Sequence, residues 1–107
     1  YDTLKSRERP DAIVVSSDCD IFAVAAACRL FGINPEKDIA IVGFDNYWQT
    51  CWERLLEDTV PAFTVDKQNN LWGEAFVQML IDRAANRLPQ NGKLRLIPSR
   101  LAFPEKN

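Results

Sequence analysis

The segment 38–46, Asp-Ile-Ala-Ile-Val-Gly-Phe-Asp-Asn, constrains the fold of this chain more than any other. It contains a continuous apolar run whose β-branched members are Ile39, Ile41 and Val42. Such a run predicts a strand of a parallel sheet that is covered on both faces. Gly43 is expected to let the backbone turn at the carboxyl end of this strand, which is the edge where open α/β sheets bind their ligands.

Two polar residues, Asp45 and Asn46, close this segment. The Asp45 carboxylate can accept hydrogen bonds from two neighbouring hydroxyl groups, and the Asn46 amide can both donate and accept. Together they suit a neutral molecule with several hydroxyl groups, such as a sugar. The same pair is equally compatible with an Asx-turn that caps the next helix, and the segment alone leaves both interpretations open.

The residues before this segment complete a β-α-β crossover unit. An apolar strand is predicted at 12–16. Ser17 and Asp18 supply N-cap chemistry for a helix that runs to about Phe31 and is stopped by Gly32. The strand of the segment 38–46 follows this helix in the sequence, so the helix connects two parallel strands.

The second half of the chain continues the alternation of strands and helices. Hydrophobic periodicity and turn residues predict, in order, an amphipathic helix at 48–57, a strand at 60–65, a helix at 67–87, and short strands at 94–97 and 100–103. Asp66 is expected to cap the long helix. This order of elements predicts an α/β fold with a mainly parallel sheet.

Two of the predicted helices carry large apolar surfaces. The helix that begins near Cys19 is apolar almost all round, which indicates burial on more than one side, either within the monomer or against a second subunit. The helix 67–87 carries an apolar stripe at helical spacing. Its members are Leu71, Trp72, Ala75, Phe76, Met79 and Leu80.

Composition excludes several classes of function. The chain has 107 residues and a net charge of −2 without a basic stripe, so it lacks the electrostatic footprint of a nucleic-acid-binding surface. No run of apolar residues approaches the roughly 18 that a membrane span needs.

The three cysteines, Cys19, Cys28 and Cys51, are odd in number and lack CxxC spacing, which favours reduced thiols and a cytoplasmic location. The first residue is not methionine, so we expect an excised segment.

An enzymatic function is not favoured. Asp18, Asp20 and Asp45 follow predicted strands and could form a carboxylate cluster for hydrolysis or magnesium-dependent phosphotransfer. However, no histidine, glycine-rich phosphate loop or nucleophile elbow accompanies them. We therefore predict no catalytic residue, no metal and no cofactor.

Three landmarks occur in order along the chain. They are Val15-Ser16-Ser17-Asp18 at the start of an apolar helix, Val42-Gly43-Phe44-Asp45-Asn46 after the next strand, and Pro61-Ala62-Phe63-Thr64-Val65 before a helix containing Leu71-Trp72-Gly73. This ordered set resembles the C-terminal part of the effector-binding core of lactose-repressor/galactose-repressor family transcription regulators. The resemblance covers the chain from Pro10 onward.

The resemblance implies the two-lobed fold of type I periplasmic sugar-binding proteins. Residues 1–107 would be the C-terminal part of that domain, a Rossmann-like three-layer lobe, and the first lobe and the helix-turn-helix DNA-binding domain would lie upstream. The protein would be a cytoplasmic homodimer that senses a small-molecule effector, a carbohydrate by resemblance. It would reach operator DNA only through the missing domain and would not contact a membrane. The alternative is a type I periplasmic sugar-binding protein of a transport system, which uses the same cleft.

The resemblance also implies a set of effector-binding residues. Asp45 falls where the family's carboxylate binds effector hydroxyls, with Asn46 beside it. Ser17 falls where many members place an asparagine, so this contact can be shorter, water-mediated or absent. Asp18 matches an acidic position that we interpret mainly as a helix N-cap. For Trp48, stacking on a sugar ring competes with core packing, and core packing is favoured. Because parallel strands end at one edge of a sheet, Asp45 and Ser17 are expected to face the same cavity.

Overall fold

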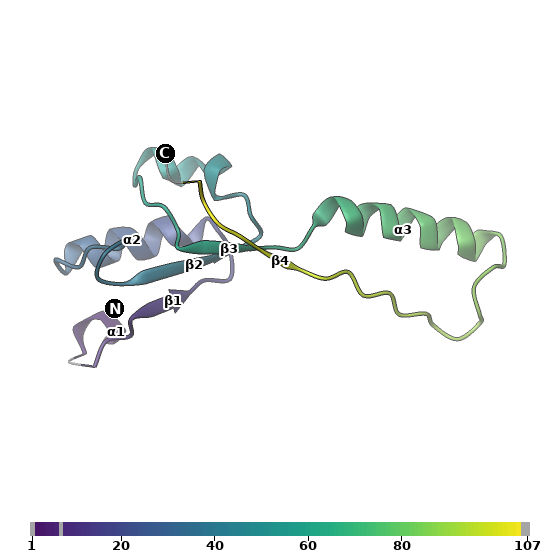
Figure 1. The fold of residues 1–107 in the computed structure, drawn as a ribbon, viewed down its shortest axis with the longest axis horizontal. Helices are drawn as coiled ribbons and strands as arrows, with labels where there is room; N and C mark the ends of the chain where they lie inside the picture. The colour runs from purple at the N-terminus through teal and green to yellow at the C-terminus, as the bar shows by residue number, and fades with distance from the viewer. Residues whose placement is uncertain (1, 7, 106–107) are drawn as a thin grey trace. The chain divides into compact units, whose positions relative to one another are not determined.

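The computed structural model describes residues 2–6 and 8–105 (Figure 1). Tyr1, Arg7 and residues 106–107 of the predicted domain lie outside the described residues. The chain divides into two compact units, and each is described by itself. The first unit comprises Tyr1–Asp66 and Leu101–Asn107, and the second comprises Lys67–Arg100.

A parallel sheet forms the centre of the first unit. Its strands are β1 (Ala12–Val14), β2 (Ala40–Phe44) and β3 (Phe63–Asp66), and β4 (Arg100–Ala102) is the next neighbour in the order β1-β2-β3-β4. β2 pairs in parallel with both β1 and β3 (Figure 1). Ile41 and Val42 of β2 are buried, as expected of a central strand. The predicted α/β fold with a mainly parallel sheet is confirmed.

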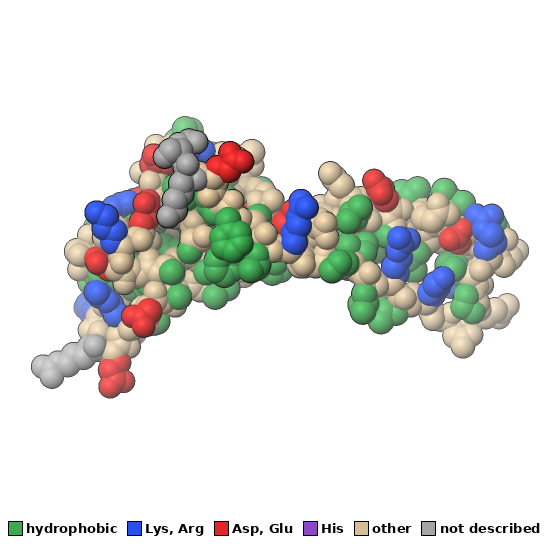
Figure 2. All heavy atoms as spheres, in the orientation of Figure 1, with side chains coloured by type: hydrophobic (Ala, Val, Ile, Leu, Met, Phe, Trp, Pro, Cys, Tyr) green, Lys and Arg blue, Asp and Glu red, His purple; other side chains and the backbone are tan. Residues whose placement is uncertain are grey.

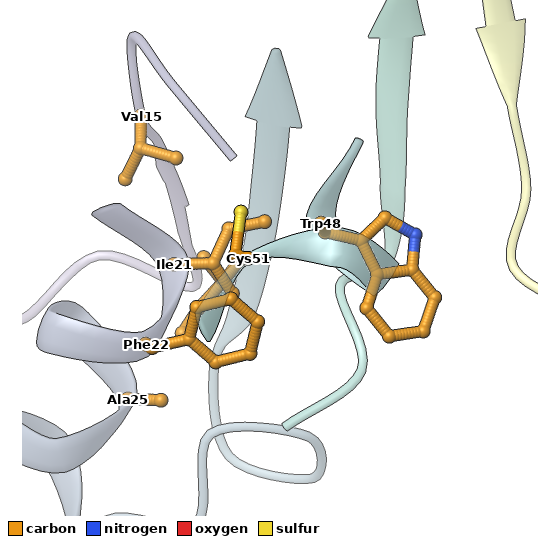
Figure 3. Close-up of a cluster of buried hydrophobic side chains, with 7 residues drawn as sticks. Val15, Ile21, Phe22, Ala25, Trp48 and Cys51 are labelled. Atoms are coloured by element: carbon orange, nitrogen blue, oxygen red, sulfur yellow. The ribbon is translucent and has the colours of Figure 1, made fainter. Parts of the chain in front are cut away.

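A helix, α2 (Asp20–Leu30), connects β1 to β2 and packs against β2. Its buried residues recur at helical spacing and are Ile21, Phe22, Ala25 and Cys28. Figure 3 shows three of them beside Val15, Trp48 and Cys51, with which they form the core of the unit. Gly32 adopts a φ of +70° directly after the helix, so the predicted stop is confirmed. A shorter helix, α1 (Asp2–Lys5), precedes β1.

The opposite face of α2 is open to solvent within this chain. Ala23 and Ala26 are exposed, and Leu30 is 87% exposed. Within this chain α2 contacts both β2 and the turn Trp52–Leu55, but no described element covers this exposed face. Its burial against a second subunit stays a prediction.

The predicted amphipathic helix at 48–57 is wrong. The chain instead forms two short 3-10 turns, η1 (Trp48–Thr50) and η2 (Trp52–Leu55). Cys51 lies between them with extended backbone angles, φ −66° and ψ 131°, which interrupts any continuous helix. The expected apolar face is divided as a result, because Trp48 and Cys51 are buried whereas Trp52, Leu55 and Leu56 are exposed.

Neither predicted aspartate cap forms. The N-cap of α2 is Cys19, without a side-chain capping bond, because the Asp18 carboxylate is directed to other partners described below. Asp66 is the last residue of β3 rather than a cap. The N-cap of the next helix, α3 (Asn69–Ala84), is Gln68, which adopts a left-handed φ of +58°.

The second unit consists of α3 and the extended segment that follows it. The helix ends at Ala84, three positions before the predicted end, with Ala85 as its C-cap. The predicted strand at 94–97 is wrong, because this segment has no strand assignment in the structure. Two side-chain hydrogen bonds connect α3 and its N-cap to residues on either side of this segment. The Gln68 side-chain amide donates to the Pro98 carbonyl at 2.6 Å, and the Arg83 guanidinium donates to the Pro89 carbonyl at 2.7 Å.

Cys19, Cys28 and Cys51 are free thiols in the structure, and the reduced state in the cell stays a prediction. Cys28 and Cys51 are buried in separate apolar clusters, and Cys19 is half-buried. Burial raises the pKa of the Cys51 thiol to about 12, and the neighbouring Cys19 thiol adds to this shift. Among the described residues, no helix has both the length and the apolar character needed to cross a bilayer.

The apolar stripe of α3 leads to a prediction about association. Of its members only Ala75 is buried, while Leu71, Phe76 and Leu80 are 44%, 58% and 70% exposed, and Figure 2 shows hydrophobic side chains on the surface of this unit. Because stable soluble monomers rarely expose a large apolar patch, we expect this 107-residue chain to form a dimer in solution. Analytical ultracentrifugation should detect the dimer at micromolar concentration.

A double variant, Phe76→Glu with Leu80→Glu, provides the matched test of this surface. Both side chains are exposed, so the charges should leave the helix folded and shift the chain toward the 12.2 kDa monomer. A wild-type chain that sediments as a monomer over the same concentration range would contradict the prediction.

Candidate functional site

The predicted site lies at the carboxyl edge of the sheet. β1 and β2 are adjacent and parallel, so the loops that follow them leave the sheet at the same edge. The two loops are joined directly, because the Asp18 backbone N–H donates to the Phe44 carbonyl at 2.9 Å. Ser17 follows β1 and Asp45 follows β2, so the topology brings these two positions to one edge, as the sequence predicts. That they share one effector cavity stays a prediction.

Asp45 and Asn46 form the turn after β2. Their φ angles are +104° and +59°, and aspartate and asparagine are the non-glycine residues that adopt the left-handed region most readily. The Asp45 N–H donates to the Val65 carbonyl at 2.8 Å, and the Asn46 N–H donates to the Thr64 hydroxyl at 3.3 Å. Strained backbone of this kind costs about 1–3 kcal/mol and is concentrated at binding sites.

The Asx-cap interpretation of this pair does not match the next element. The N-cap of η1 is Tyr47, and no side chain caps that turn. Neither Asp45 nor Asn46 therefore occupies the capping position. Both residues follow β2 at its carboxyl end.

Gly43 has a different role from the one that the sequence predicts. It lies inside β2 rather than at the turn. A Cβ atom at this position would overlap Oδ1 of Asp18 and would lie 2.8 Å from Cδ1 of Ile21. The expectation that Gly43 turns the backbone is wrong, because the positive φ angles belong to the next two polar residues. Glycine is required here so that the Asp18 carboxylate can approach the sheet.

Asp18 joins three elements beneath the site. Its side chain is fully buried, and Oδ2 accepts hydrogen bonds from the backbone N–H groups of Tyr47 at 2.6 Å and Trp48 at 3.0 Å. Oδ1 accepts a hydrogen bond from the Thr64 hydroxyl at 2.6 Å. A buried carboxylate is tolerated when donors satisfy it in this way. The geometry therefore gives Asp18 a positioning role for the loop after β2.

Ser17 and Tyr47 form a hydroxyl pair at the same edge. The Ser17 Oγ lies 2.6 Å from the Tyr47 hydroxyl oxygen, and the Tyr47 side chain is partly exposed. The Ser17 hydrogen bond lowers the pKa of Tyr47, but the Cys19 thiol and burial outweigh it and raise that pKa overall, so the phenol is neutral near pH 7. The set of site residues predicted from the sequence lacks Tyr47 and Thr64. The position of Tyr47 directly after Asn46 is the signal that could have identified it.

Trp48 belongs to the core. Its side chain is 6% exposed and packs in the cluster that contains Ile21 and Cys51. The Arg54 guanidinium lies over its ring, 5.1 Å from the centroid. Of the two interpretations of Trp48, core packing is the one that is confirmed.

The cavities near the site contain only part of the predicted set. A cavity of about 380 Å³ is lined by Asn46 and Trp48 together with Gln49 and residues 102–105, and its lining includes neither Asp45 nor Ser17. A larger cavity of about 840 Å³ is lined by Ala40 and Pro61 near the amino ends of β2 and β3 and also by Trp48, and its lining includes neither Asp45 nor Ser17. We place the candidate site at the carboxyl edge, because ligands of parallel sheets bind there.

Comparison with known proteins finds a sequence similarity to a transcriptional repressor. The HTH-type transcriptional repressor PurR of Klebsiella pneumoniae subsp. pneumoniae is 29% identical over 98 residues, which are 89% of this chain and 26% of the repressor. The same repressor of Klebsiella pneumoniae strain 342 matches with the same values. The chain thus spans about a quarter of the length of the curated relatives that it matches.

Both matched proteins are transcriptional repressors, which is consistent with the resemblance to lactose-repressor/galactose-repressor regulators. No protein-family model matches the chain. No solved structure matches it significantly.

Proposed function

We propose that this chain is the effector-sensing part of a bacterial transcription regulator of the lactose-repressor/galactose-repressor family. The observation that carries the proposal is the match to a transcriptional repressor along 89% of the chain. In this proposal the chain is the C-terminal part of a periplasmic-binding-protein-like domain. The regulator acts in the cytoplasm as a homodimer and reaches operator DNA through a separate domain upstream.

The proposed effector is a small, neutral, hydroxylated molecule, and a carbohydrate fits this description. Asp45 accepts hydrogen bonds from effector hydroxyls, and Asn46 donates or accepts beside it. The hydroxyl pair of Ser17 and Tyr47, 2.6 Å apart, extends the polar surface of the same edge. Asp18 is buried and holds the Tyr47 backbone from below. The proposal therefore assigns direct contact to Asp45, Asn46 and Ser17, and support to Asp18 and Trp48.

Effector binding would act through the relative arrangement of two lobes. An effector held between lobes favours the arrangement to which it binds more tightly, and that shift changes how paired DNA-binding domains meet an operator. This chain would supply one half of such a cleft. The coding sequence upstream separates this proposal from a periplasmic sugar-binding protein, because a helix-turn-helix segment identifies the regulator and a secretion signal identifies the transport protein.

Replacement of Asp45 by alanine tests the site. In the intact regulator, a thermal-shift screen of neutral monosaccharides and disaccharides identifies an effector, and calorimetry then measures its affinity. Asp45→Ala should weaken binding by about 1.5–3 kcal/mol, which is the range for a hydrogen bond to a charged group. Operator affinity without effector should be unchanged, because in the proposal the DNA-binding surface lies in another domain.

Asp11→Ala is the matched control for this measurement. Asp11 is exposed and directly precedes β1, at the opposite edge of the sheet from Asp45. Its replacement removes the same charge without touching the proposed site. Equal effector affinities for the wild type and Asp45→Ala would remove Asp45 from the site.

A further inference from the structure

We propose that Cys19, Cys51 and Glu53 form a binding site for a thiophilic divalent cation, and that Zn²⁺ is the ion that their ligand types fit best. The two sulfur atoms lie 2.8 Å apart, and the ligand atoms of all three residues lie within 4.8 Å of one another. Cys19 is the N-cap of α2, Cys51 lies between η1 and η2, and Glu53 is the second residue of η2. Cys19 and Cys51 are 32 positions apart in the sequence.

The ligand types of the three groups match those of a zinc coordination shell. Zn²⁺ binds cysteine sulfur at about 2.3 Å and carboxylate oxygen at about 2.0–2.2 Å, in tetrahedral geometry. Two sulfur ligands of one tetrahedral ion are separated by about 3.7 Å at those bond lengths. The sulfurs of Cys19 and Cys51 are closer than this and closer than the contact of about 3.5–4.0 Å that unbonded heavy atoms prefer. Moving them apart by about 1 Å would open the space that an ion needs.

Glu53 provides an independent observation that points to a cation. Its Oε2 atom is buried and has no hydrogen-bond partner among the described residues. A buried carboxylate oxygen without a partner is unfavourable, and a bound cation would satisfy it. The neighbouring Arg54 does not fill this role, because its guanidinium lies over the Trp48 ring and 3.5 Å from the Asp58 carboxylate.

The charge balance of the site is favourable for a divalent ion. Binding converts the Cys19 and Cys51 thiols to thiolates and releases two protons, and with the Glu53 carboxylate the ligands then carry three negative charges against the two positive charges of Zn²⁺. Three protein ligands leave the fourth tetrahedral position for water or another small ligand. The weak hydrogen bond from the Cys51 thiol to the Tyr47 carbonyl, 3.7 Å long, would be lost. The ion would tie the start of α2 to the segment that follows Tyr47.

Cobalt and zinc titrations of the chain test this proposal. The wild-type chain, reduced and stripped with a chelator, should bind one Co²⁺ with the near-ultraviolet charge-transfer absorption that reports thiolate ligands. One equivalent of Zn²⁺ should displace the Co²⁺ and remove that absorption, and Zn²⁺ added to the metal-free chain should release two protons. Cys19→Ser should abolish the absorption, and Glu53→Gln should weaken Zn²⁺ binding at least tenfold. Cys28→Ser should leave both unchanged, because Cys28 is buried in a different cluster.

A measurement on the wild-type chain keeps the proposal testable if a variant fails to fold. Zn²⁺ should slow alkylation of Cys19, the half-buried cysteine, in the native chain. Two results would overturn the proposal. One is a reduced wild-type chain that takes up no Co²⁺ or Zn²⁺, even if its Cys19 and Cys51 form a disulfide after an oxidant is added. The other is metal binding that Cys19→Ser leaves intact.

Discussion

Replacing Asp18 with alanine should lower the free energy of unfolding by about 3–5 kcal/mol, because three buried donors lose their shared acceptor. The carboxylate is fully buried and accepts hydrogen bonds from Tyr47 N–H, Trp48 N–H and the Thr64 hydroxyl. Alanine leaves these three donors without an acceptor, and each unsatisfied buried group costs about 1–3 kcal/mol. Urea denaturation followed by circular dichroism measures the change.

Asp20→Ala is the matched control for Asp18→Ala. Asp20 lies two positions further on, in the first turn of α2, and its exposed carboxylate accepts only a long hydrogen bond of 3.4 Å from the Ser16 hydroxyl among the bonds described. Its loss should cost less than about 1 kcal/mol. Asp18→Asn should fall between the two, because its amide oxygen can still accept from one donor while its NH₂ group faces others. A cost below about 1 kcal/mol for Asp18→Ala would show that the three hydrogen bonds do not hold the loop.

The βαβ unit could be predicted from the sequence because its signals are local. The apolar run of β2 and the helical spacing of α2 each arise within a few residues, and both elements form as the pattern indicates. Gly32 supplies the stop of α2 through its own positive φ. Periodicity of this kind needs no knowledge of distant contacts.

The role of Asp18 could not be predicted because its partners are distant in sequence. The residue sits where an N-cap is expected, so the local signal favours a cap. Its actual donors lie 29, 30 and 46 positions away. Those contacts also fix the backbone at Tyr47 and Trp48, at the start of the segment where the apolar spacing predicted a continuous helix. The start of α2 and the segment 48–57 therefore both differ from the local prediction, because hydrogen bonds to residues distant in sequence determine their structure.

The candidate site could be predicted only in part, because some of its contacts also join residues that are distant in sequence. Asp45 and Asn46 follow directly from the end of a strand, and parallel pairing brings Ser17 to their edge. The pairing of Ser17 with Tyr47 spans 30 positions and left no pattern in the sequence. The stripe of α3 illustrates a further limit, because helical spacing predicts an apolar face without predicting which surface covers it.

Gly43→Ala should destabilise the chain by about 3 kcal/mol, at the upper end of the range for a methyl group forced into a packed core. The added Cβ would overlap Oδ1 of Asp18 and lie 2.8 Å from Cδ1 of Ile21. Neither atom can move aside easily, because the carboxylate is held by its donors and Ile21 is fully buried.

Gly73→Ala is the control for Gly43→Ala. Gly73 lies in α3 with nothing within 4 Å of an added Cβ, so alanine there should stabilise the chain by about 0.5–1 kcal/mol.

A double-mutant cycle between Gly43→Ala and Asp18→Ala shows whether the two residues act through one contact. Removal of the carboxylate removes the main clash, so Gly43→Ala should cost at least about 1 kcal/mol less in the Asp18→Ala background than in the wild type. If the double variant retains too little folded chain, an osmolyte such as trimethylamine N-oxide raises the stability of all four proteins in the cycle. Additive effects within about 0.5 kcal/mol would mean that Gly43 is needed for another reason. Non-additive effects would establish that Gly43 is needed in β2 because it leaves room for the Asp18 carboxylate. That carboxylate positions Tyr47 and therefore the hydroxyl pair at the proposed effector edge.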